Sequence, residues 1–248
     1  MSGNIAKLNQ LLATPSVKQK FVDALGKEAG SFLASLVEVY SNTGLRDCDP
    51  GDVLREALKA AALRLPIVSA LGYAYLIPYK RGNRTIPQFQ LGYRGLIQLA
   101  LRSGQYKRIA VTEVYEGERI IKKITGEIEK AGEPLSDNII GLIGYFQLNS
   151  GFECWDSITR EEAEAHGKRF SKSFDSPSSP WQTDFWAMAK KTLLKRMLSK
   201  YGLISVEFVQ ALAQDKEPEQ IEGQGEIEFI DVDYSEVEKE GKDENRES

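Results

Sequence analysis

Residues 72–108 read G-Y-A-Y-L-I-P-Y-K-R-G-N-R-T-I-P-Q-F-Q-L-G-Y-R-G-L-I-Q-L-A-L-R-S-G-Q-Y-K-R. Side chains of two kinds alternate over 73–79, which predicts a strand with two different faces. A basic turn over 80–84 leads into a second strand over 86–91, and the proline in each strand favours sheet edges. A helix is expected over 93–103, and Gly104 is expected to end it. The stretch therefore predicts an edge hairpin followed by a helix.

Helices and further strands flank this unit, and together they define the fold class. Asp49 is a predicted N-cap with Pro50 at the first helical position, and Thr159 with Glu162 forms a capping-box signature. We expect an α+β fold with a small, mostly antiparallel sheet and a hairpin, packed by helices. The other expected elements are helices over 4–12, 17–40, 50–65, 159–170, 181–201 and 205–213, and strands over 106–117, 118–128, 139–149 and 152–156.

Charge divides the chain into a basic body and an acidic tail. The whole chain has 36 acidic and 32 basic side chains, of which residues 214–248 carry 14 and 4. Residues 1–213 therefore carry 22 acidic and 28 basic side chains, a net charge of +6. This asymmetry indicates a body that binds a polyanion and a separate interaction segment. A solvated surface with a solubilising tail is the alternative.

Several classes of protein have no support in the sequence. No apolar run reaches ~18 residues, so no membrane span is expected, and the N-terminus lacks the pattern of a secretory signal. Cys48 and Cys154 lie far apart, which favours a reducing cytoplasm over a disulfide. There is no phosphate-binding loop or nucleophile elbow, and the single histidine, His166, lies on a polar helix. We therefore expect no catalysis and no cofactor, with a metal-dependent nuclease as an alternative.

Cationic side chains gather in three places, and aromatic residues lie between them. The hairpin turn projects its cations into solvent. On the next helix Arg94, Gln98 and Arg102 share one side, and no acidic residue occurs from Arg81 to Arg108. The third place is the helix over 181–201. Cations beside aromatic rings are typical of a surface that binds single-stranded nucleic acid.

Each of these features also has an ordinary structural explanation. A polar turn needs no ligand, and tyrosines pack well in strands. On the helix over 181–201, Lys191 and Lys195 are four residues apart and oppose a core stripe that includes Trp186 and Leu193. Cations near a helix C-terminus also interact favourably with the helix dipole. The combination within one short span is more specific than any single residue.

Five segments resemble the RecT-type single-strand annealing proteins of phages, a group with lambda Red beta as a remote relative. The most specific are A-L-K-A-A-A-L-R-L-P at 57–66, G-Y-A-Y-L-I-P-Y at 72–79 and Q-L-G-Y-R-G-L-I-Q-L-A-L-R-S-G-Q-Y at 90–106. V-Y-E-G-E at 114–118 and S-P-W-Q-T-D-F-W-A-M-A-K-K-T-L-L-K at 179–195 complete the set. The common family form has Asp where this chain has Glu118, which is a mild departure.

The resemblance implies a function in homologous recombination. Such proteins bind single-stranded DNA, anneal complementary strands without ATP and hold the annealed duplex as a ring or filament of identical subunits. The fold is distantly similar to the Rad52 annealing core. The partners are a phage 5′→3′ exonuclease and a single-strand-binding protein of the host, which places the protein in the bacterial cytoplasm. A single-strand binder that protects DNA without annealing is the alternative.

The resemblance also assigns parts and residues. We expect an N-terminal helical oligomerisation element over 1–66, a core for single-strand binding and annealing over 67–213, and an acidic, disordered tail over 214–248. The tail is the segment associated with partner binding. The predicted DNA-binding residues are Lys80, Arg81, Arg84, Arg94, Arg102, Lys107, Arg108, Lys190, Lys191, Lys195 and Arg196.

Overall fold

The computed structural model describes residues 2–82, 84–171, 173–177, 179–202 and 205–215. One cluster of buried side chains runs from Leu8 in the first helix to Ala211 in the last. The helices are α1 (Ser2–Ala13), α2 (Pro15–Leu25), α3 (Ala29–Asn42), α4 (Pro50–Ala62), α5 (Tyr93–Arg102), α6 (Arg160–Phe170), α7 (Pro180–Thr183), α8 (Phe185–Tyr201) and α9 (Val206–Gln214). The strands are β1 (Ala74–Arg81), β2 (Arg84–Leu91), β3 (Tyr106–Tyr115), β4 (Arg119–Lys122), β5 (Ile128–Ala131), β6 (Ile139–Leu148) and β7 (Glu153–Thr159).

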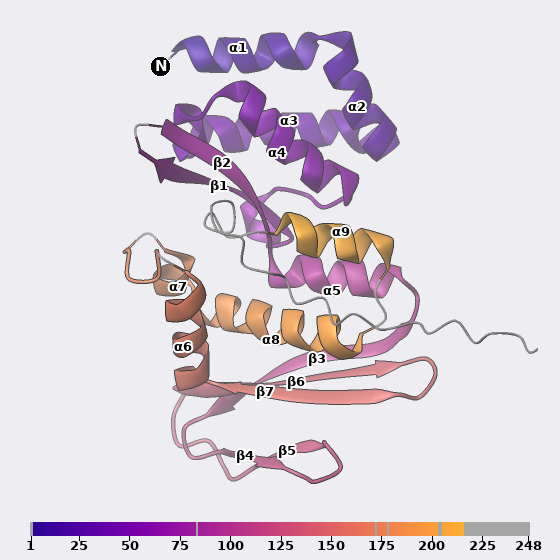
Figure 1. The fold of residues 1–248 in the computed structure, drawn as a ribbon, viewed down its shortest axis with the longest axis vertical. Helices are drawn as coiled ribbons and strands as arrows, with labels where there is room; N and C mark the ends of the chain where they lie inside the picture. Colours follow the sequence, from indigo (N-terminus) through magenta and orange to yellow (C-terminus); the bar gives the residue numbers. More distant parts are fainter. Residues whose placement is uncertain (1, 83, 172, 178, 203–204, 216–248) are drawn as a thin grey trace, which may run out of the picture.

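The elements stack in layers along the long axis of the molecule. The helices α1 to α4 form one end, the hairpin β1–β2 lies beneath them, and α5, α8 and α9 form the middle (Figure 1). The antiparallel sheet β3–β6–β7 lies under α8, and the hairpin β4–β5 forms the other end. The predicted α+β class is confirmed, although the strands form three separate antiparallel sheets rather than one.

The hairpin β1–β2 has the two faces that the alternation predicts. Ala74 and Leu76 are buried, whereas Tyr75 and Ile77 on the other face are half-buried. Pro78 pairs directly with its counterpart Pro87 in the antiparallel register. A proline has no N–H for a third strand, so both strands of this two-stranded sheet are edges, as predicted.

Glycines allow α5 to approach the hairpin closely. The Gly92 N–H donates to the Tyr73 carbonyl oxygen at 3.0 Å. A Cβ on Gly95 would lie closer than 3.0 Å to that same oxygen and 2.9 Å from Leu91 Cδ1. The G-Y-R-G segment therefore fixes the start of α5 against the backbone that precedes β1.

Three predicted elements differ from the structure. The helix expected over 17–40 is interrupted at Gly26, whose positive φ of 59° ends α2. The helix expected over 181–201 is two helices, because Asp184 leaves helical geometry and its side chain caps α8 through the Ala187 N–H. The single strand expected over 118–128 is the start of the hairpin β4–β5, with a turn at Gly126.

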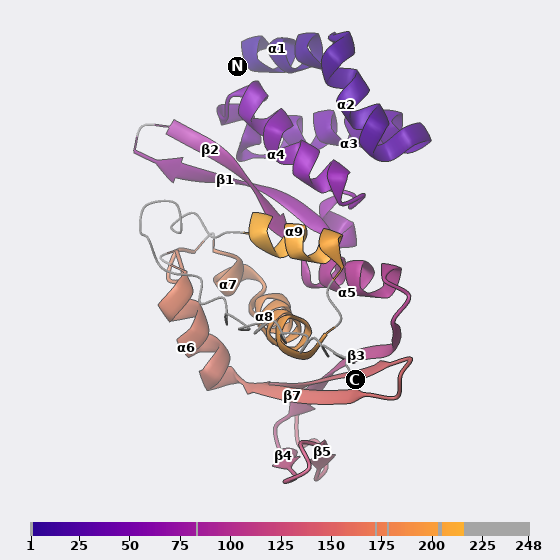
Figure 2. The same ribbon diagram turned by 45° about the vertical axis from the view of Figure 1, so that its right-hand side comes forward.

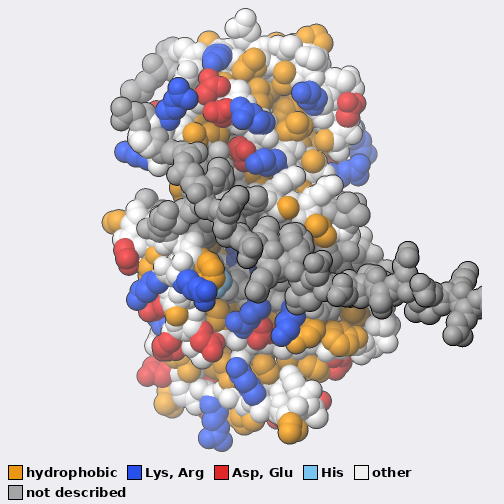
Figure 3. Space-filling model, in the orientation of Figure 1, with side chains coloured by type: hydrophobic (Ala, Val, Ile, Leu, Met, Phe, Trp, Pro, Cys, Tyr) orange, Lys and Arg blue, Asp and Glu red, His pale blue; other side chains and the backbone are white. Residues whose placement is uncertain are grey.

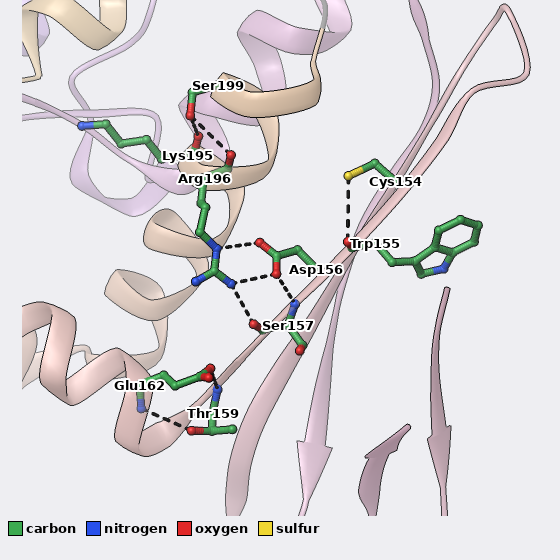
Figure 4. Close-up of polar contacts among 9 residues, drawn as sticks. All are labelled: Cys154, Trp155, Asp156, Ser157, Thr159, Glu162, Lys195, Arg196 and Ser199. Atoms are coloured by element: carbon green, nitrogen blue, oxygen red, sulfur yellow. Dashed lines mark hydrogen bonds and ion pairs between the residues drawn. The ribbon is translucent and has the colours of Figure 1, made fainter. Parts of the chain in front are cut away.

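The predicted helix caps are confirmed. Asp49 accepts a hydrogen bond from Gly51 at the start of α4. Thr159 and Glu162 form a reciprocal capping box, in which each side chain bonds the backbone N–H of the other (Figure 4). These bonds satisfy N–H groups that a helix start leaves without partners.

Both cysteines are free and buried. Burial is the main reason that the pKa of the Cys48 and Cys154 thiols rises to about 11. Within the described ranges, no helix is both long and apolar enough to span a membrane.

Candidate nucleic-acid interface

Helix α8 is the central element of the candidate interface because it has a core face and a cationic face. Its core face buries Ala189, Leu193 and Met197, and this face packs on the sheet at Gly144 of β6. Trp186, predicted to belong to the core stripe, is only half-buried. The remaining faces carry the cations Lys190, Lys191, Lys195 and Arg196.

The hairpin, the start of α5 and the start of α8 meet around a pocket of about 210 Å³. Tyr75 of β1 and Tyr93 of α5 line it together with Lys191 of α8. Next to it, the Lys190 ammonium and the Arg94 guanidinium each lie 5.8 Å from the centroid of the Tyr93 ring. The fold thus brings cations from two predicted sites to one pair of aromatic rings.

Lys190 is paired with a carboxylate of the sheet. Its Nζ donates to Glu113 Oε1 on β3 at 2.6 Å, and both side chains are partly buried. This hydrogen bond holds the pKa of Glu113 below its ordinary value, against the opposing effect of burial. Lys190 therefore links α8 to the sheet while it contacts Tyr93.

Lys191 and Lys195 share one buried carboxylate, that of Asp215. Lys191 Nζ donates to Oδ1 at 2.8 Å and Lys195 Nζ to Oδ2 at 3.4 Å. The Leu91 N–H at the end of β2 also donates to Oδ1, at 2.9 Å. Burial alone would raise the pKa of Asp215, but the two lysines and this N–H outweigh it and lower the pKa. Asp215 is therefore ionised at neutral pH.

Arg196 points from α8 to the edge of the sheet. Its guanidinium makes a bidentate pair with Asp156 on β7, at 2.6 and 2.9 Å, and donates to the Ser157 carbonyl oxygen at 2.7 Å. Figure 4 shows Arg196 directed at β7 while the adjacent Lys195 extends away from it. Adjacent cations of α8 thus pair with carboxylates of different elements.

His166 of α6 lies near these cations. It is half-buried, and its ring centroid lies 4.6 Å from that of Phe170, so the imidazole is packed against its own helix although that helix is polar. Burial, followed by the charges of Arg196 and Lys195, lowers its pKa. His166 is therefore neutral at pH 7 and adds no cation to the surface.

The predicted residues of α5 have different environments. Arg94 is exposed, and its Nε donates to the Tyr93 hydroxyl at 3.2 Å. Arg102 lies eight residues on, about 12 Å along the helix at ~1.5 Å per residue. Its guanidinium donates to the carbonyl oxygens of Leu63 and Arg64 at 2.6 and 2.9 Å. Arg102 thereby satisfies carbonyls at the end of α4, where Arg64 has a positive φ of 51°.

The other predicted cations are exposed. Lys80 and Arg84 lie in the hairpin next to its turn, whereas Lys107 and Arg108 lie at the start of β3. None of these four has an ion-pair partner in the part of the chain that the structure describes. The side chain of Arg81 lies outside the described residues. Figure 3 shows Lys and Arg side chains on both halves of one face, with Asp and Glu among them.

The cationic surface is therefore divided into parts. The structure brings together Arg94, Lys190 and Lys191 around the tyrosine pocket, with Lys195 on the next turn of α8. It places Arg102, Lys107 and Arg108 at the opposite end of α5. Sequence reasoning did not identify Tyr93 as the ring that contacts the cations, although the interleaving of aromatic and basic residues indicated such a contact.

Three carboxylate partners also went unnoticed: Glu113, Asp156 and Asp215. They come from β3, β7 and the residue after α9, so no local spacing connects them with α8. Within the described ranges, no three His, Cys, Asp or Glu side chains gather in the way a metal ion needs.

Comparisons with known proteins identify one family. The RecT family profile matches residues 30–231, which include the hairpin, α5 and α8. The uncharacterized protein YqaK of Bacillus subtilis (strain 168) is 44% identical over 215 residues, 86% of this chain and 73% of that protein. Protein RecT of Escherichia coli (strain K12) is 30% identical over 216 residues, 82% of this chain and 78% of that protein.

Proposed function

The chain belongs to the RecT family, and on this basis we propose that it binds single-stranded DNA and anneals complementary strands in homologous recombination. The observation that best supports DNA binding is the cluster of Arg94, Lys190 and Lys191 around Tyr75 and Tyr93. Cations contact phosphates whatever the sequence, and aromatic rings stack on any base. The site therefore suits a ligand of variable sequence.

Annealing follows if the strand is held by its backbone. Each subunit holds a few nucleotides through phosphate contacts, so most bases stay free to test a second strand. Pairing supplies the driving force, because each stacked step contributes about 1.4 kcal/mol. The reaction therefore proceeds without ATP and without catalysis by side chains.

Assembly and partners complete the proposal. Subunits associate into a ring or filament, which joins weak individual sites into one continuous track with high avidity. The helices α1 to α4 provide subunit contacts. The acidic residues after Asp215 recruit a partner, either the exonuclease that exposes the strand or a host single-strand-binding protein. The protein works in the cytoplasm of a bacterial host.

A mixing experiment tests this function. Two complementary oligonucleotides, each with one dye of an energy-transfer pair, are combined with and without the protein, in the absence of ATP. An annealing protein accelerates the rise in energy transfer, whereas a protein that only protects single strands slows it. The labelled strands are also examined for shortening in the presence of Mg²⁺, because shortening would indicate a nuclease instead.

A further inference from the structure

Lys191, which lines the tyrosine pocket, also lines a second cavity of about 250 Å³, and Asp215 is part of the wall of this second cavity. Lys191, Lys195 and Ser199 line it from successive turns of one face of α8. Trp181, only 3% exposed, borders the same cavity. Its indole Nε1–H has no acceptor among the described residues. Buried N–H groups normally have hydrogen-bond partners. The cavity is therefore bordered by an N–H donor for which the described residues provide no acceptor oxygen.

The carboxylate of Asp215 occupies an anion site with three converging donors. Two ammonium groups, of Lys191 and Lys195, and the backbone N–H of Leu91 all bond to it. Ammonium groups and backbone N–H groups are also the donors that proteins use for DNA phosphates. The donor set is therefore as suited to a phosphate as to a side-chain carboxylate.

Charge balance favours the replacement of the Asp215 carboxylate by a DNA phosphate. A phosphodiester and a carboxylate each carry one negative charge, so replacement leaves Lys191 and Lys195 paired in both states. A buried lysine without a partner would be strongly unfavourable. The exchange therefore avoids the main cost of removing Asp215 from this site.

The position of Asp215 allows it to leave without unfolding α9. Phe208 and Ala211 of α9 are buried, and the helix packs against α5 and β2 (Figures 1 and 2). Asp215 follows the last helical residue, and its N–H donates to Ala211 at 3.0 Å. A shift of the residues that follow Ala211 would withdraw the carboxylate while Phe208 and Ala211 stay packed.

We propose that Asp215 occupies a phosphate site of the DNA interface in the free protein, and that a phosphate of single-stranded DNA displaces it. The proposal rests on the proposed function and adds regulation to the same site. Only those protein molecules whose phosphate site is free of the Asp215 carboxylate can bind DNA at this site. The carboxylate therefore lowers the apparent affinity of the protein for DNA. By linkage, DNA binding also releases Asp215, the residue that precedes the acidic segment 216–248 with its 13 acidic and 4 basic side chains.

The test compares Asp215→Asn with the full-length wild type by fluorescence anisotropy with a labelled oligodeoxythymidine. The amide oxygen can still accept a hydrogen bond from the Leu91 N–H, but the side chain has lost the negative charge that pairs with the two ammonium groups. We expect binding tighter by on the order of tenfold, the gain when an open fraction of about one tenth approaches one. Glu133→Gln removes the same charge from an exposed position after β5 and should change affinity less than about twofold.

Two further measurements separate competition from a structural role. In a Lys191→Gln Lys195→Gln background the gain from Asp215→Asn should disappear, because both lysines that the carboxylate blocks are absent. In the wild type, hydrogen exchange in the last turn of α9 should become several-fold faster when the oligodeoxythymidine is added. This second measurement needs no variant, so it stands even if Asp215→Asn folds poorly.

The outcomes distinguish the two proposals. If the wild type binds DNA while Asp215→Asn, with a native far-UV circular dichroism spectrum, binds equally or more weakly, displacement of Asp215 is wrong and DNA binding stands. The same conclusion follows if α9 exchange is unchanged or slower with DNA. If neither protein binds the oligodeoxythymidine at low ionic strength, the proposed function itself fails.

Discussion

The contact between α5 and the hairpin predicts opposite effects for two glycine-to-alanine substitutions. In Gly95→Ala the new methyl group would lie closer than 3.0 Å to the Tyr73 carbonyl oxygen and 2.9 Å from Leu91 Cδ1. The first of these atoms is backbone and cannot rotate away. In Gly30→Ala, at an exposed position of α3, nothing lies within 4 Å of the new Cβ.

The expected magnitudes follow from two opposing terms. Alanine favours a helix over glycine by about 1 kcal/mol. Overpacking a buried contact costs ~1–3 kcal/mol, and the upper end applies where backbone must move. Gly95→Ala should therefore lower the free energy of unfolding by about 2 kcal/mol, or roughly 4–8 °C in Tm for a domain of this size. Gly30→Ala should raise it by ~0.5–1 kcal/mol.

Thermal unfolding followed by far-UV circular dichroism measures both effects under identical conditions. A second readout is DNA affinity, because displacement of α5 would move Tyr93 and Arg94 away from Lys190. Equal or higher Tm in Gly95→Ala would refute the close approach of α5 to the hairpin. A lower Tm in both variants would show that helix propensity does not govern the control position.

Other predictions concern the charged groups. Lys191→Ala weakens the pairing of buried Asp215 and should lower the free energy of unfolding by ~3 kcal/mol, roughly 6–12 °C in Tm. Lys107→Ala, at an exposed position, is the control. Equal Tm values for the two variants would contradict the pairing of Lys191 with Asp215. The pKa values of Glu113 and Asp215 are lowered in the folded state. The stability that these two carboxylates contribute is therefore complete above about pH 5, and it is lost as the pH falls through their folded-state pKa values. Urea unfolding at several pH values checks this, and pH-independent stability would count against it. If about six phosphates are neutralised per subunit, log K should fall against log[salt] with a slope of about −4; a flat dependence would exclude the cationic interface. Deletion of residues 216–248 should leave annealing intact or faster in the mixing assay, and a loss of annealing would place that segment in the core.

Local chemistry explains what the sequence predicted well. The N-cap at Asp49, the capping box at Thr159 and the paired prolines of the hairpin each depend on a few neighbouring residues. Such patterns have one dominant structural solution. The family resemblance is confirmed, whereas the similarity to the Rad52 core and the individual DNA contacts stay predictions. A disordered tail is expected from residue 214, which is wrong for its first two residues, because Gln214 ends α9 and Asp215 is buried. The rest of that tail, 216–248, lies outside the described residues.

The errors arose where tertiary contacts override local preference. The apolar spacing on either side of Gly26 continues without a break, so periodicity alone gives one helix where the backbone makes two. Asp184 likewise lies inside a helical pattern, but its carboxylate caps α8 and starts a new helix there. A short polar side chain inside a helical run competes with the backbone for hydrogen bonds. Only the packing around each residue decides that competition.

The cations of α8 could be recognised from the sequence, but their electrostatic state could not. Lys191 and Lys195 repel each other at a spacing of four residues, and the partner that relieves this repulsion, Asp215, lies after a different helix. Lys190 and Arg196 likewise have carboxylate partners that are distant in the sequence: Glu113 on β3 pairs with Lys190, and Asp156 on β7 pairs with Arg196.

The cations of α8 therefore stabilise the fold through internal carboxylates. Under the proposed function, DNA that binds at this helix would have to exchange with those carboxylates. It follows that fold stability and DNA affinity oppose each other at this helix. A substitution that removes a carboxylate partner should lower Tm while it tightens DNA binding. Removal of a lysine should lower both the Tm and the DNA affinity. A general loss of structure would also lower both quantities, so only the opposite changes expected for a carboxylate substitution distinguish the proposal from unfolding.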